Sequence, residues 1–153
     1  MKKNPLSLAA QERMAPGRLS RGGFLGTDDR PIEEIVAADQ AALEQAGVSR
    51  EQLADLVDDL HRRADAALEG PVTLGGGRVH VRLIEVMGRI PCPFACGFRT
   101  HKASLEVTAG DLRLTLTPMH AHLIRAHGFF QGKGSDFRVE PADLAALYRL
   151  CRE

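Results

Sequence analysis

The sequence predicts an α+β fold in which two helices come first and two antiparallel β-hairpins follow. Between residues 28 and 70, apolar side chains recur at helical spacing. From Pro71 to Leu116 they alternate instead, as they do in half-buried strands. After Thr117 the helical signals return in a short segment and again at the end of the chain. The hydrophobic fraction of 44% is ordinary for a globular protein and is enough to build a core.

Residues 1–27 are rich in Pro, Gly, Ser and Arg and show no periodicity, so we expect a mobile tail. An arm that docks on a partner is the alternative. The segment has no apolar run typical of an export signal, and no stretch of the chain approaches the roughly 20 apolar residues of a membrane helix. We therefore expect a cytoplasmic protein without a membrane partner, whose three cysteines are reduced thiols or metal ligands.

The region 28–70 is predicted to form a helical hairpin. The first helix starts at Pro31, with Asp29 as its cap, and ends at Gly47. A capping box of Ser49 and Gln52 opens the second helix. That helix continues through one apolar stripe, which is consistent with core packing or with a helix–helix dimer surface, and ends at Gly70-Pro71.

The charge of the chain is zero overall but unevenly distributed. Residues 28–70 carry twelve acidic and four basic side chains, whereas residues 1–27 carry one acidic and five basic ones. The acidic region is suited to a basic partner, to the basic ends of its own chain, or to a second copy. Neutral overall charge argues against a dedicated nucleic-acid-binding protein, because such proteins rely on neutralising phosphates.

Two β-hairpins follow in residues 71–116. In the first, two short apolar alternations flank the turn Gly75-Gly76-Gly77, and a change of phase at Leu83-Ile84 predicts a β-bulge. In the second, the strands flank the turn Ala109-Gly110-Asp111. The triple glycine lacks the Lys-Ser/Thr pair of a phosphate-binding loop, so turn formation is the better explanation.

A short helix is predicted after the second hairpin, with Thr117 as its cap, Pro118 as its first residue and Gly128 as its end. It carries three histidines. After a loop over residues 129–140, Pro141 begins a C-terminal helix. We expect residues 28–153 to form one compact unit, in which residues 71–153 are an α+β region that holds a metal site.

The metal site is predicted from Cys92 and Cys96, which lie on a tight turn between Pro91 and Gly97. Zinc takes four tetrahedral donors, and a gap of two to four residues lets one turn supply two of them. The other two donors would come from the segment His122-Leu-Ile-Arg-Ala-His127. Metal-free packing and a redox dithiol are the alternatives. Redox pairs usually have a Cys-x-x-Cys spacing at the start of a helix, which this chain lacks.

This segment, residues 90–128, resembles a Cys₂His₂ zinc finger, with a Cys pair, a β-hairpin and a helix that ends in a His pair. Met119 occupies the position three residues before the first His, where that family usually has an apolar residue. The chain departs from the family because 25 residues separate Cys96 from His122, roughly double the family spacing. A longer hairpin accounts for the difference, and it weakens any inference that the helix enters a DNA groove.

Helix geometry favours His122 and His127 as the histidine ligands. They are five residues apart, about 140° of rotation in an ideal α-helix, so they converge only if the last turn tightens or unwinds before Gly128. His120 is the reserve candidate, although it lies about 10 Å from His127 along the axis. His101 comes third. Four nearby aromatic residues, Phe94, Phe98, Phe129 and Phe130, suggest an apolar cluster around the metal.

Three functions are compatible with this reading. The first is a binding or scaffold protein that structural zinc stabilises, with a protein partner or self-association. The second is nucleic-acid binding through Arg99, Lys102, Arg113 and Arg125. The third is a zinc-dependent hydrolase with one ligand position open to water. No nucleophile turn, paired carboxylates or Ser-His-Asp ordering stands out, so we assign no catalytic residues and favour a non-enzyme.

Overall fold

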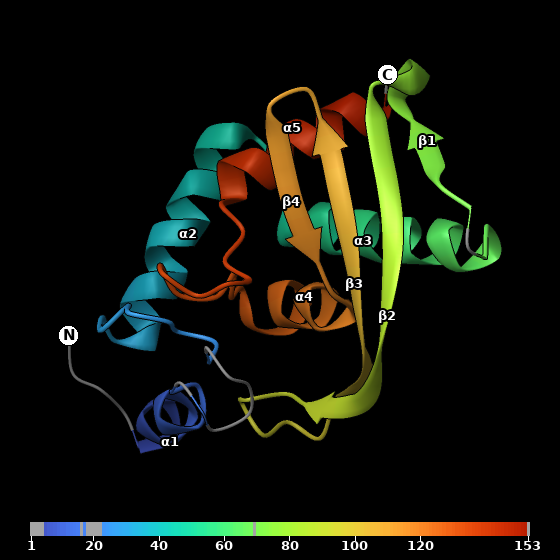
Figure 1. Ribbon diagram of the computed structural model, residues 1–153. Coiled ribbons are helices and arrows are strands. Elements are labelled where there is room, and N and C mark those ends of the chain that lie inside the picture. The colour runs from blue at the N-terminus through green and yellow to red at the C-terminus, as the bar shows by residue number, and fades with distance from the viewer. Residues whose placement is uncertain (1–4, 16, 18–22, 69, 153) are drawn as a thin grey trace.

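The computed structural model describes residues 5–15, 17, 23–68 and 70–152. These form the predicted α+β fold, with a four-stranded sheet and helices (Figure 1). In chain order the elements are α1 (Pro5–Arg13), α2 (Ile32–Ala46), α3 (Arg50–Ala66), β1 (Val72–Leu74), η1 (Gly75–Gly77), β2 (Val79–Pro91), β3 (Arg99–Ala109), β4 (Leu112–Leu116), α4 (Pro118–His122), η2 (Leu123–His127) and α5 (Pro141–Arg152).

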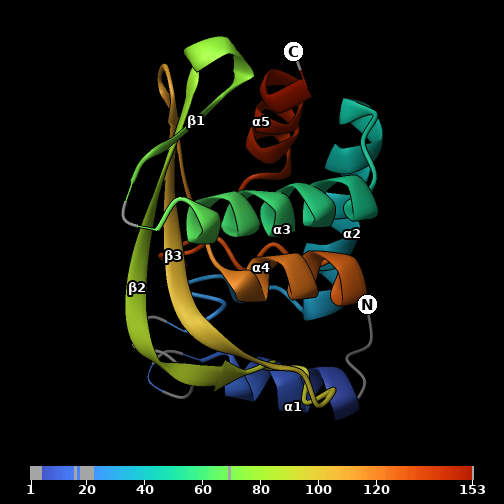
Figure 2. The same cartoon turned by 90° about the vertical axis from the view of Figure 1, so that its right-hand side faces the viewer.

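The sheet is antiparallel throughout, with strand order β1-β2-β3-β4, so each strand pairs with its neighbour in the sequence. Both predicted hairpins are confirmed. The predicted bulge at Leu83-Ile84 is misplaced, because the register shifts between Glu85 and Arg89. Glu85 lies opposite Ala103 and Arg89 lies opposite His101, so three residues of β2 share the space of one residue in β3. Beyond this irregularity the two long strands bend away from the rest of the sheet (Figure 2).

Helices α3, α4 and α5 lie on one face of the sheet, and none of the described helices covers the other face (Figure 2). Alternate side chains of β3, β4 and the first residues of β2, where Val79 and Val81 are buried, point into the space between the two layers, as the period of two requires. The main core consists of these side chains together with the apolar stripes of α3 and α5. Among its fully buried members are Leu53, Leu60, Val79, Leu105, Leu116, Leu144 and Leu147.

The end of α2 and the start of α3 lie at predicted signals, whereas α3 ends at Ala66, before the predicted stop at Gly70-Pro71. Gly47 terminates α2 in the left-handed conformation, and Ser49 and Gln52 form the reciprocal capping box of α3. The cap of α2 is Pro31, and Asp29 makes no side-chain cap there. Although a short turn joins the two helices, their main neighbours differ. Helix α2 packs mainly against α5, whereas α3 packs against α4, η2 and the sheet as well as against α5.

The described part of residues 1–27 differs from the mobile tail that the sequence predicts. Residues Pro5–Arg13 form helix α1, and the side chains of Met14 and Phe24 are buried. The Phe24 amide donates to the Met14 carbonyl, which brings the two ends of this segment together. The segment folds because its few apolar side chains fill a second core at the bent end of the sheet, a long-range contact that local periodicity does not reveal.

Among the described residues, no helix is long and apolar enough to cross a membrane.

Candidate metal centre

Residues 92–98 form a tight loop at the bent end of the sheet, between β2 and β3. The Cys92 amide donates to the Phe98 carbonyl (2.9 Å), and the Ala95 amide donates to the Cys92 carbonyl (3.0 Å). Ala95 and Gly97 adopt left-handed backbone conformations, with φ of 57° and 95°. The loop therefore reverses twice within a few residues, and Gly97 supplies one reversal at no steric cost. Both cysteine side chains are presented on the same side of it.

The histidine ligands come from the segment that follows β4. Thr117 caps α4, Pro118 is its first residue, and the helix ends at Gly128, as predicted. Between Leu123 and His127 the helix widens into one π turn, labelled η2. A π turn has i→i+5 hydrogen bonds, so residues five apart come close to one face. This is the unwinding that convergence of His122 and His127 requires.

The four predicted ligands come together in space. Cys92 Sγ lies 3.5 Å from His127 Nε2, and Cys96 Sγ lies 3.2 Å from His122 Nε2. All four ligand atoms lie within 4.8 Å of one another. A tetrahedral zinc with Zn–S bonds of about 2.3 Å and Zn–N bonds of about 2.0 Å separates sulfur from nitrogen by roughly 3.5 Å. Two thiolates and two imidazoles are also a donor set that suits zinc, so the residues fit this ion.

Phenylalanine rings hold both imidazoles in place. Phe98 stacks on His122, with ring centroids 3.9 Å apart, and Phe94 stacks on His127 at 4.1 Å. Phe129 in turn contacts the edge of Phe94. The apolar cluster expected around the metal is therefore present, but Phe130 does not belong to it. The Phe130 ring is buried in the main core, whereas its neighbour Phe129 is buried in the second core with Cys92.

Burial sets the protonation of the cluster. It lowers the pKa of His122 and His127, so both imidazoles are neutral at pH 7, the form that binds metal. Burial, with the Cys96 thiol close by, raises the pKa of the Cys92 thiol to about 11. A metal cation has to displace that proton, so binding releases protons to the solvent.

The reserve histidines do not belong to the cluster. His120 is fully buried, its Nδ1 accepts from the Thr117 amide (2.9 Å), and its Nε2 donates to the Phe137 carbonyl (2.7 Å). Both ring nitrogens are thus occupied, and His120 instead fixes the start of α4 to the loop before α5. His101 lies on β3 with an exposed side chain and is outside the cluster.

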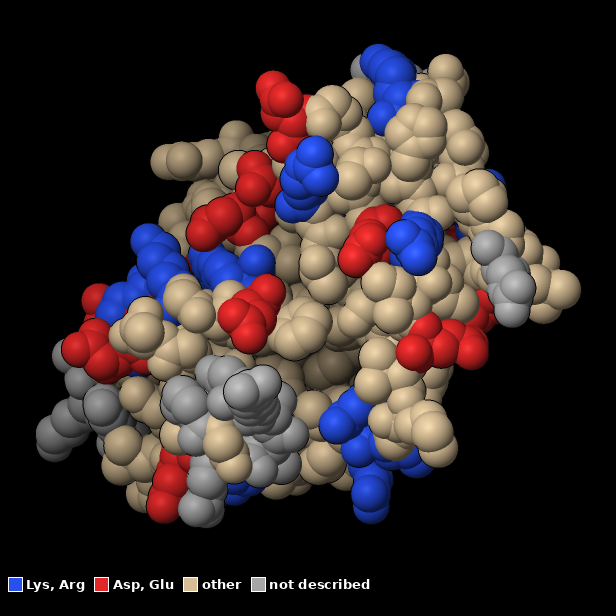
Figure 3. Space-filling model, in the orientation of Figure 1, with Lys and Arg blue, Asp and Glu red and all other residues tan. Residues whose placement is uncertain are grey.

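The four basic residues considered for nucleic-acid binding are not brought together. Arg125 is enclosed by three carboxylates of α3, at 2.8–3.0 Å. Arg99 begins β3 at the end near the metal, whereas Arg113 on β4 pairs with Thr108 near the opposite end. Lys102 lines a cavity. On the face shown in Figure 3, Lys and Arg are scattered among acidic side chains.

Sequence reasoning missed the contribution of helix α1 to this centre. The Arg13 Nε donates to the Pro93 carbonyl (2.6 Å), which fastens α1 to the cysteine loop. Buried Ala10 and Met14 belong to the same apolar cluster as Cys92. The only signal in the sequence was a few apolar residues within a segment otherwise typical of a tail.

The fold and the site define an α+β protein with a Cys₂His₂ cluster built on a loop and a π-containing helix. No protein-family model, curated protein or solved structure matches the chain. The likeness to zinc fingers therefore rests on the arrangement of these residues and not on a family match.

Proposed function

We propose that the protein is a zinc-stabilised binding scaffold for another protein chain. The observation that carries the proposal is the convergence of four donor atoms, all within 4.8 Å of one another, from two segments of the chain. An ion bound there joins the loop after β2 to the helix after β4. It thereby adds to the apolar packing of the second core at this irregular end of the molecule.

A structural role for zinc is favoured over hydrolysis. Four protein ligands complete a tetrahedral coordination sphere, so no position is left for a reactive water. The rings of Phe94 and Phe98 cover the two imidazoles. No carboxylate belongs to the cluster among the described residues, so no group there is placed to act as a general base.

The partner surface that we propose is the outer edge of β2. Strand β1 pairs only with Val79–Val81, so within the described residues β2 has no strand beside it on that edge from Arg82 onward. Ile84, Val86 and Met87 are exposed there, and the Met87 side chain is 95% exposed. An open strand edge with apolar side chains favours the addition of an extended segment from another protein. A second copy of this chain is the simplest such partner.

Metal analysis of the purified protein tests the zinc site. We expect about one zinc per chain in the wild type, and loss of both zinc and thermal stability in Cys92→Ser. Cys151→Ser is the matched control, because Cys151 is half-buried at the edge of the main core and lies outside the cluster. Wild-type protein that binds no zinc under reducing conditions, or Cys92→Ser protein that keeps it, would refute the proposal.

Sedimentation velocity over a range of concentrations tests the partner surface. We expect reversible self-association in the wild type and a monomer in Val86→Lys, because a charge on the open edge opposes strand pairing. Arg82→Lys keeps the charge on the same strand and serves as the control. A wild-type protein that remains monomeric throughout would exclude pairing of two copies at this edge.

A further inference from the structure

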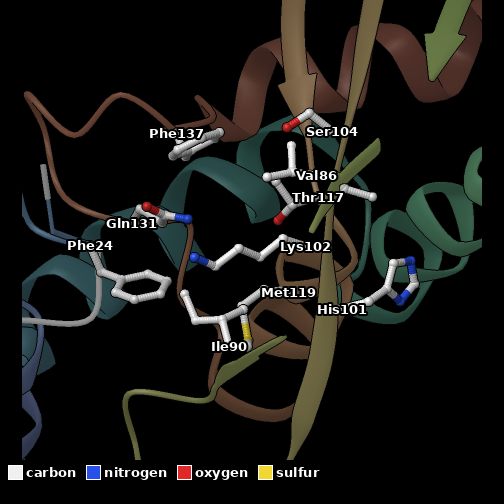
Figure 4. Close-up of a pocket in the computed structure, with 11 residues that line it drawn as sticks. Phe24, Val86, Ile90, His101, Lys102, Ser104, Thr117, Met119, Gln131 and Phe137 are labelled. Atoms are coloured by element: carbon white, nitrogen blue, oxygen red, sulfur yellow. The ribbon is translucent and has the colours of Figure 1, made fainter. Parts of the chain in front are cut away.

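A cavity of about 220 Å³ lies beside the metal centre, where β2 and β3 bend away from the sheet. Figure 4 shows the side chains that line it. They come from β2, β3, the start of α4, the segment before α2 and the loop before α5. The cavity thus forms where segments far apart in the sequence meet, and it is separate from the four metal ligands.

Its walls are mostly apolar, and they include Phe24, Met119 and Phe137. An apolar cavity of about 150 Å³ is large enough to hold benzene. A volume of about 220 Å³ therefore suits a molecule slightly larger than benzene, such as one ring with a short substituent. Water gains few hydrogen bonds in such a space, so an apolar ligand body is favoured there.

Two hydrogen-bond donors face this apolar space. The Lys102 ammonium and the side-chain amide nitrogen of Gln131 point toward one another across it (Figure 4). Lys102 makes no ion pair with any described residue, and none of the described residues that line the cavity is acidic. Two donors cannot satisfy one another, so their complement is an acceptor that carries negative charge.

Gln131 is held in place by its surroundings. The residue is only 3% exposed, and its backbone φ is 71°, an unfavourable value for a side chain other than Gly. The Ser135 hydroxyl shares its proton between Gln131 Oε1 (2.9 Å) and the Gly23 carbonyl (3.2 Å), and the Arg138 guanidinium donates to the Gln131 carbonyl (2.8 Å). With its oxygen engaged, the amide nitrogen is directed into the cavity, and it donates to none of the described residues.

We propose that this cavity is a binding site for a small carboxylate with a single-ring apolar body. The carboxylate lies between Lys102 and Gln131, and the ring occupies the space bounded by Phe24, Met119 and Phe137. The charge-assisted hydrogen bonds fix the orientation of the ligand, and the apolar walls supply most of the affinity.

Titration with phenylacetate, followed by amide chemical shifts of the zinc-loaded protein, tests the site. We expect saturable binding in the millimolar range or tighter, with shifts at Ala103, Thr117 and Gln131. The neutral probe 2-phenylethanol should bind more weakly, since it brings no charge to Lys102. Absence of saturable phenylacetate binding, or equal affinity for the alcohol, would overturn the proposal.

Two variants, Lys102→Met and Ala103→Leu, test where the ligand binds, and Lys133→Met serves as the control. Lys102→Met should weaken phenylacetate about tenfold to a hundredfold and leave 2-phenylethanol unchanged, because it removes the ammonium but keeps the side-chain stem. Lys133→Met, an identical change outside the cavity, should have no effect. Ala103→Leu should abolish binding of both probes by filling the cavity, with zinc content and melting temperature confirming that the protein is folded. Unchanged phenylacetate affinity in Lys102→Met or in folded Ala103→Leu protein would refute the assignment.

Discussion

The two hydrophobic clusters of this protein are built in different ways. The main core lies between the sheet and helices α3 and α5, and regular secondary structure supplies nearly all of its side chains. The second cluster surrounds the metal centre, and it is assembled from α1, the cysteine loop, the start of α2 and the π turn. Backbone hydrogen bonds within strands and helices position the first set of side chains. The second set depends on loops and, in our proposal, on an ion.

The two ends of the molecule therefore need different sources of stability. Residues Leu105 and Leu116 are fully buried and are held opposite one another on paired strands. The backbone of residues 92–98 has only a few internal hydrogen bonds and two left-handed residues. Without a metal, the packing of the second core and the hydrogen bond from Arg13 to Pro93 have to offset the cost of ordering such a loop.

Removal of zinc with a chelator should release one end of the protein and spare the other. Structural zinc in small peptides supplies about 10–16 kcal/mol of apparent binding free energy, more than any single contact here. We expect amide protection from hydrogen exchange to fall in α1, residues 92–98 and η2, while β3, β4 and α3 keep most of theirs. Added zinc should restore the lost protection. An equal loss in both regions would contradict the division into two halves.

Asp39→Ala should destabilise the half that needs no metal. The Asp39 carboxylate accepts two hydrogen bonds from Arg138, at 2.7 and 2.8 Å, and both side chains are less than 10% exposed. Loss of Asp39 leaves the buried Arg138 guanidinium with Glu140, a half-exposed carboxylate, as its remaining ionic partner, and we expect a cost of about 2–4 kcal/mol in urea denaturation. Asp59→Ala, which removes an exposed pair with Arg63, should cost less than about 1 kcal/mol. Equal costs for the two variants would argue against this interpretation.

Stability should fall as the pH drops, partly through His61 on α3. Burial lowers the pKa of His61 from 6.5 to about 4, although Asp65 and Asp58 oppose the shift. Between these values the unfolded chain binds a proton that the folded chain does not, so acid favours unfolding. We expect His61→Gln to remove about 1–2 kcal/mol of the stability lost between pH 6.5 and 4, measured by urea denaturation at each pH. A profile unchanged by the substitution would exclude this role.

Arg13→Met should loosen α1 without removing the metal. The Arg13 guanidinium donates to the Pro93 carbonyl, and a hydrogen bond of this kind contributes about 1 kcal/mol. We expect faster hydrogen exchange in α1 and a zinc content equal to that of the wild type. Arg99→Met is the control, since it removes an exposed guanidinium next to the same loop. Unaltered exchange in α1 would mean that apolar packing alone holds the helix.

Local signals in the sequence were reliable wherever a few neighbouring residues decide the conformation. The capping box at Ser49 and the helix ends at Gly47 and Gly128 depend on residues within a few positions, and all three are confirmed. The turn of the first hairpin follows from three consecutive glycines for the same reason. Where long-range packing decides, the predictions were wrong, as with the residues now seen in α1 and the position of the bulge in β2.

The candidate site shows the same contrast between local sequence signals and long-range packing. Residue type and spacing were sufficient to select Cys92, Cys96, His122 and His127 as a ligand set, because few side chains bind zinc and a turn or helix brings close pairs together. Spacing alone did not reveal that Arg125 is neutralised by α3. It also did not reveal the cavity between Lys102 and Gln131, whose walls come from five separate segments.

The sequence by itself determined the α+β class, the order of the main elements and the four candidate ligands, since these follow from periodicity, caps and donor chemistry within short stretches. Only the tertiary structure decided that α1 covers the metal end, that His120 is a buried link to Phe137, and that a π turn brings His122 and His127 together. The physical reason is that such features depend on side chains far apart in the chain competing for the same buried space.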